Sequence, residues 1–171
     1  MSILDESELL LHVADLAVAF AGFAGIGTAL GEHVNSERQV DAGRLTNMLI
    51  TSLGTAMLAL VPFIPALYGF EESSAWGIAA ISALVVMAVF LPGTVMRAKR
   101  MKRYEGFSAR RNAFNFGLSA VAIAGFLSCA LGFPSHNRSA AYISALAALL
   151  MVSAILFFSV LVSLLRPHAP D

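Results

Sequence analysis

Five long apolar segments constrain the fold of this chain more than any other feature. Each is at least as long as the ~20 residues that an α-helix needs to cross the hydrocarbon core of a bilayer. The apolar runs are continuous rather than alternating, which favours helices over membrane β-strands. We therefore expect an all-α, polytopic transmembrane helical bundle forming a single integral membrane domain over residues 1–171, with spans at about 9–31, 45–70, 75–96, 112–133 and 142–165. If the first segment lies in the membrane interface, four spans remain.

The low content of charged residues agrees with a membrane location. Only 13% of the residues are charged and 58% are hydrophobic, whereas soluble domains carry about 25% charged residues. Two prolines interrupt the second half of the second segment, Pro62 and Pro65, and we expect them to kink or break that helix. The third span is expected to end near Pro92 and to be followed by a basic loop over 97–111.

Lysine and arginine are distributed very unevenly between the two sides of the predicted bundle. If the loop 97–111, which holds seven of them, is cytoplasmic, ten of the 11 lie on the cytoplasmic side and only Arg138 lies outside. This is the pattern of the positive-inside rule. We therefore expect a multi-pass protein of a bacterial inner (cell) membrane, with its N-terminus outside and its C-terminus in the cytoplasm.

The polar residues of the spans fall into two groups at different depths. The outer group surrounds Asp15, the one acidic residue inside a span, and contains His12, Tyr68 and Tyr142, of which the two tyrosines are candidate hydrogen-bond partners of Asp15. The inner group contains Asn47, Thr51, Asn112 and Asn115. One interpretation is a transport pathway with an acidic outer site and an amide-lined inner mouth. The other is that these groups only hold helices together.

Small residues in the first span predict a close helix contact. Ala17, Ala21, Gly25 and Ala29 form a row at spacing four, and Gly22 lies on the face that carries Asp15. Rows of this kind allow two helix backbones to approach closely in lipid. We expect the contact within one subunit or between subunits.

Several classes of function lack a sequence signal. No nucleophile motif or phosphate-binding glycine loop is present, so we expect no enzymatic activity. Cys129 is the only cysteine, and the histidines other than His12 fall in loops or the tail, so we expect no metal and no cofactor. We expect no nucleic-acid partner. The basic loop 97–111 either binds anionic lipid headgroups or only sets the orientation.

The run AVAFAGFAG at 17–25 resembles uncharacterised small multi-pass bacterial membrane proteins. The resemblance implies a membrane location and no particular activity. Together these features predict a small homo-oligomeric channel or transport-type protein. The alternative is a non-catalytic membrane subunit or scaffold that binds a partner subunit in a larger complex.

Overall fold

The computed structural model describes residues 6–30, 36–103, 108–133 and 137–164, and these residues form α-helices and turns without a strand. The helices are α1 (Ser7–Leu30), α2 (Ser36–Leu60), α3 (Phe63–Leu67), α4 (Glu72–Met101), α5 (Ala109–Leu131) and α6 (Arg138–Leu164). All except α3 are long and apolar enough to cross a membrane. The predicted all-α bundle of five spans is therefore confirmed, and these helices are those of a small integral membrane protein.

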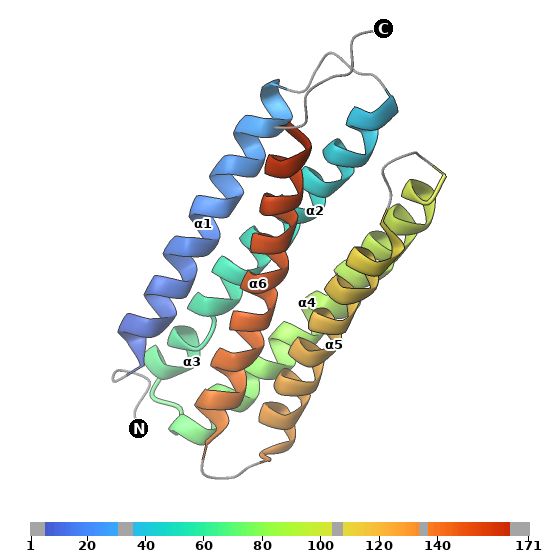
Figure 1. The fold of residues 1–171 in the computed structure, drawn as a ribbon. Coiled ribbons are helices and arrows are strands. Elements are labelled where there is room, and N and C mark those ends of the chain that lie inside the picture. The colour runs from blue at the N-terminus through green and yellow to red at the C-terminus, as the bar shows by residue number, and fades with distance from the viewer. Residues whose placement is uncertain (1–5, 31–35, 104–107, 134–136, 165–171) are drawn as a thin grey trace, which may run out of the picture.

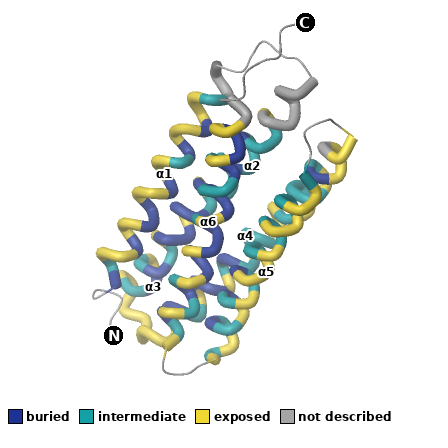
Figure 2. Tube along the Cα trace, in the orientation of Figure 1, coloured by how far each residue is buried: buried dark blue, intermediate teal, exposed yellow. Residues whose placement is uncertain are grey.

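The bundle consists of two parts that share α6. Helices α1, α2 and α6 pack side by side along most of their lengths, while α4 and α5 form a hairpin that packs against α6 (Figure 1). The hairpin lies close to the other helices near α3 and diverges from α2 towards the α4–α5 turn (Figure 1). Figure 2 shows the same asymmetry in burial, because the dark buried stretches of α4 and α5 gather towards the α3 end. The bundle therefore has a closed end near α3 and an open end near the α4–α5 turn.

The prolines of the second predicted span break the helix as expected. Helix α2 ends at Leu60, and Pro62 is the N-cap residue of the short helix α3. A proline lacks the backbone N–H that would continue the ladder of helical hydrogen bonds. The second predicted span is thus a helix followed by a short turn of helix.

The predicted end of the third span at Pro92 is wrong, because α4 continues through Pro92 to Met101. Membrane helices tolerate an internal proline, and within this stretch the Thr94 hydroxyl donates to the Phe90 carbonyl at 3.2 Å. The residues after Pro92 include arginine, lysine and alanine, which favour helix. Part of the expected basic loop 97–111 is therefore helical. The chain between the first two predicted spans is also helical from Ser36 onwards, because α2 begins there.

The contact face of α1 differs from the predicted row of small residues. Ala17 and Ala21 are buried as expected, but the line continues to Ala24 rather than to Gly25. Gly22 and Gly25 lie on the outward face, with no atom within 4 Å of a Cβ built at either position. A row at spacing four rotates about 40° per step around a helix, so it leaves the contact face after two steps. The side chain of Ala29 lies outside what the structure describes.

We expect adjacent substitutions in α1 to differ sharply in their effect on stability. Ala24 is fully buried against Leu45, Met48 and Val152, so Ala24→Leu overpacks this contact and should cost about 1–3 kcal/mol. Gly25→Leu points into open space and should leave the thermal midpoint in detergent within error of the parent. A greater loss of stability for Gly25→Leu than for Ala24→Leu would contradict this assignment of the face.

Candidate functional site

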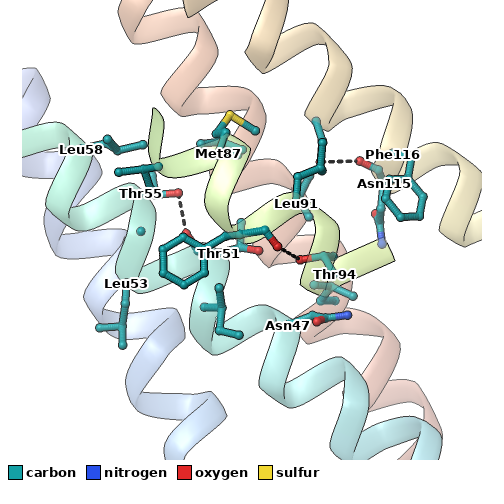
Figure 3. Close-up of a pocket in the computed structure, with 18 of the residues that line it drawn as sticks. Asn47, Thr51, Leu53, Thr55, Leu58, Met87, Leu91, Thr94, Asn115 and Phe116 are labelled. Atoms are coloured by element: carbon teal, nitrogen blue, oxygen red, sulfur yellow. Dashed lines mark hydrogen bonds between the residues drawn. The ribbon is translucent and has the colours of Figure 1, made fainter. Parts of the chain in front are cut away.

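A cavity of about 520 Å³ lies between α2, α4, α5 and α6 towards the open end of the bundle, and we call it the interhelical cavity. This volume is in the range of small-molecule sites in proteins. Its walls are mainly apolar, with Leu149, Val152 and Leu156 of α6 at the back. Polar side chains from three helices interrupt these walls (Figure 3): Asn47, Thr51 and Thr55 of α2, Ser82 and Thr94 of α4, and Asn112, Asn115 and Ser119 of α5.

Helical periodicity explains why these polar residues meet. On α2, Arg44, Asn47, Thr51 and Thr55 follow one another at spacings of three and four, so they occupy one face. On α5, Asn112, Asn115 and Ser119 repeat the pattern. The structure thus brings Asn47, Thr51, Asn112 and Asn115, the inner polar group of the sequence analysis, to the walls of the same cavity.

Four hydroxyl groups of the cavity, those of Thr55, Ser82, Thr94 and Ser119, already have hydrogen-bond acceptors in their own helices. Thr55 Oγ1 donates to the Thr51 carbonyl at 2.8 Å, and Ser119 Oγ donates to the Asn115 carbonyl at 3.0 Å. Ser82 Oγ donates in the same way to the Ile78 carbonyl at 2.9 Å. These bonds allow the hydroxyl groups to lie in a membrane helix without a partner on another helix.

The amide oxygens of Asn47 and Asn115 differ from the hydroxyl groups. Both Oδ1 atoms are buried and accept no hydrogen bond within the described part of the chain. A buried polar atom without a partner destabilises the folded state by about 1–3 kcal/mol. Such atoms in a cavity wall are available to a donor that enters the cavity, which makes them the strongest indication of a binding site in this structure.

The structure does not bring the predicted outer group together. Asp15 and His12 lie on the outward face of α1, where His12 Nε2 is 3.8 Å from Glu8 Oε1. The Asp15 carboxylate forms no hydrogen bond with any described residue. Tyr68 follows α3 and is 80% exposed.

Tyr142, the last member of that group, belongs to the closed end of the bundle. Its hydroxyl donates to the Leu58 carbonyl at 2.7 Å. The expected hydrogen bond between Tyr142 and Asp15 is therefore not formed. The ring is fully buried and contacts the rings of Trp76 and Phe126, with centroid distances of 5.5 Å and 5.2 Å. Cys129 is also buried there, and its Sγ donates to the Trp76 carbonyl oxygen at 3.5 Å.

Sequence reasoning missed the contribution of α4 to the cavity. Ser82, Val86, Phe90 and Thr94 recur at spacing four and line it. That spacing was visible in the sequence, but the third span reads as almost purely apolar and its serine and threonine stand far apart. Arg44 and Arg111 also line the cavity, and they were assigned only to loops.

Comparison of the chain with protein-family models, with curated proteins and with solved structures gave no match. The geometry of the interhelical cavity is therefore the basis on which a function can be proposed. Within the described residues, no group of three or more metal-ligating side chains comes together.

We expect the two tyrosines to differ in their importance for stability. Tyr142→Phe removes the hydroxyl that donates to the Leu58 carbonyl and should lower the free energy of unfolding by about 1 kcal/mol. Tyr68→Phe removes an exposed hydroxyl and serves as the matched control, with no expected change. Thermal unfolding in detergent measures both, and equal effects would show that the bond to Leu58 contributes nothing.

Proposed function

We propose that this protein is a transport-type membrane protein and that the interhelical cavity is the binding site for its solute. The proposal depends most on two buried amide oxygens, Asn47 Oδ1 on α2 and Asn115 Oδ1 on α5, which accept no hydrogen bond from the residues that the structure describes. They come from different helices and line one cavity. A purely structural amide normally finds a partner across the helix contact.

The arrangement of the bundle supports movement as well as binding. The α4–α5 hairpin packs closely at the α3 end and diverges from α2 at the other, with the cavity between them. A rocking movement of the hairpin against α1, α2 and α6 would close the open end and open the closed one. Relative movement of two helix groups around a central site is the usual mechanism of secondary transport.

The outward face of α1 favours a second candidate function, that of a subunit which binds a further copy of itself or a partner. Asp15 lies about 12 Å along α1 from Ser7, on a face that also exposes Gly22 and Gly25. A carboxylate that faces lipid costs at least ~2.5 kcal/mol, and a neighbouring chain would cover it. If this candidate is right, Gly25→Leu should reduce the oligomer size in mild detergent without loss of the fold.

The proposed movement has a test that needs no knowledge of the solute. Spin labels are placed in pairs on a Cys129→Ala background, at Ala42 and Ala113 for the open end and at Leu67 and Leu131 for the closed end, all exposed positions. Pulsed electron paramagnetic resonance in lipid nanodiscs should give two distance populations for each pair. The shorter open-end distance should accompany the longer closed-end distance when conditions shift the populations.

A third pair, at Val18 of α1 and Phe158 of α6, is the control within one part of the bundle. Both positions are exposed, and their helices pack against each other. This pair should give one distance under every condition. A single unchanged distance for all three pairs would overturn the transport proposal.

A further inference from the structure

We propose that the solute of the interhelical cavity is a bilayer lipid with an anionic headgroup, bound with its headgroup at Arg44 and Arg111 and an acyl chain along the cavity. This inference rests on the proposed function and names its substrate class. Four observations support it: the length of the cavity, its lateral opening, its apolar walls and its basic end.

The cavity is long and open on one side. It extends along α2 from Arg44 to Val61, which corresponds to about 25 Å at 1.5 Å per residue. Leu53, Met57 and Phe90 line it and are also 46%, 71% and 50% exposed. The opening therefore lies between α2 and α4, on the apolar surface that a bilayer would cover. A lipid can enter from the side, and one leaflet of a ~30 Å core is shorter than the cavity.

The walls beyond the polar residues suit a hydrocarbon chain. Leu58 of α2, Met87 and Leu91 of α4 and Leu149 of α6 line the cavity (Figure 3 shows the first three). Water would gain few hydrogen bonds in such a space, whereas an acyl chain buries apolar surface there. Methionine adapts to chains of different shape because its side chain is flexible.

The basic end supplies complementary charge for a headgroup. Arg44 on α2 and Arg111 on α5 both line the cavity, and Arg111 also lines a second hollow together with Ser108 and Arg110. Guanidinium groups bind phosphate oxygens in a bidentate manner. Basic pockets between membrane helices are typical sites for anionic lipid headgroups.

The amides lie where a lipid changes from polar to apolar. Asn47 follows Arg44 by three residues and Asn115 follows Arg111 by four, so each amide lies about one turn deeper than its arginine. At that depth a bound phospholipid presents its glycerol and ester groups. Its ester oxygens accept hydrogen bonds, and the Nδ2 groups of Asn47 and Asn115 can donate to them.

This assignment differs from the lipid site expected over 97–111. Of the described residues in that stretch, only Ser108 and Arg111 line the interhelical cavity. Lys102 and Arg103 are exposed and contribute to neither hollow. They supply the same charge outside the proposed site and so provide a matched control.

The test measures which lipid the protein retains. The purified full chain is mixed with detergent micelles that contain equal amounts of phosphatidylglycerol and phosphatidylcholine, separated from free lipid, and analysed for bound lipid by mass spectrometry. The parent should retain phosphatidylglycerol on the order of tenfold over phosphatidylcholine. Arg44→Gln combined with Arg111→Gln should reduce that preference by a similar factor. Lys102→Gln combined with Arg103→Gln should leave it unchanged.

A second pair of variants tests the acyl chain rather than the headgroup. Gly54 lines the cavity, and a Cβ built there has no atom within 4 Å, so Gly54→Phe introduces a large side chain at the cavity wall. It should lower retention of both lipids. Gly22→Phe adds the same side chain on the outward face of α1 and should change nothing.

The contrary results are distinct. Equal retention of both lipids by the parent, an equal effect of the two charge pairs, or full retention by Gly54→Phe would each overturn the lipid assignment. If the spin-label distances still show two populations, the transport proposal stands and the solute belongs to another class. If the distances do not change while phosphatidylglycerol is retained, the lipid is a fixed component and the transport proposal is wrong.

Discussion

The side chain of Tyr142 holds the two parts of this bundle together at their closed end, through a hydrogen bond to the Leu58 carbonyl and ring contacts with the α4–α5 hairpin. It joins α6 to the last turn of α2, and the ring of Tyr142 packs against Trp76 of α4 and Phe126 of α5. One buried side chain of α6 therefore contacts three other helices. Lipid offers no alternative partner for the hydroxyl or the carbonyl, so breaking this hydrogen bond in a membrane would leave both groups unpaired. The position of the interhelical cavity follows from where this contact ends.

Side-chain size along α4 explains why the bundle opens in one direction. Towards the closed end α4 buries Ala75, Ala79, Ala80 and Ala83 completely, and small residues allow helices to approach closely in lipid. Further along α4, the large side chains of Val86, Met87, Phe90 and Leu91 line the cavity instead of filling it. The same helix thus closes the bundle at one end and holds it apart at the other, which makes the cavity a consequence of sequence rather than of loose packing.

Hydropathy predicted the spans because an apolar run long enough to cross a bilayer usually forms a transmembrane helix. The inner polar group was also visible, since Asn47 and Thr51 repeat at the helical period. Spacing alone did not give the rotation of α1, because a row at spacing four leaves the contact face after two steps and Gly25 points outwards. Pro92 was expected to end the third span, but α4 continues through it, because membrane helices tolerate an internal proline. The hydrogen bond between Tyr142 and Leu58 joins residues far apart in the chain, so no local sequence pattern predicts it.

The buried Oδ1 atoms of Asn47 and Asn115, which have no partner among the described residues, destabilise the fold unless a ligand binds them, and the proposed binding site depends on them. Asn47→Leu and Asn115→Leu preserve approximate size and remove the unpaired oxygens. The most direct measurement is the thermal midpoint of each variant in detergent without added lipid. If the amides serve a ligand, both midpoints should equal or exceed that of the parent, because replacing an unsatisfied buried polar group by an apolar one is neutral or stabilising. A clear fall in both midpoints would show that the amides hold helices together and would contradict the account.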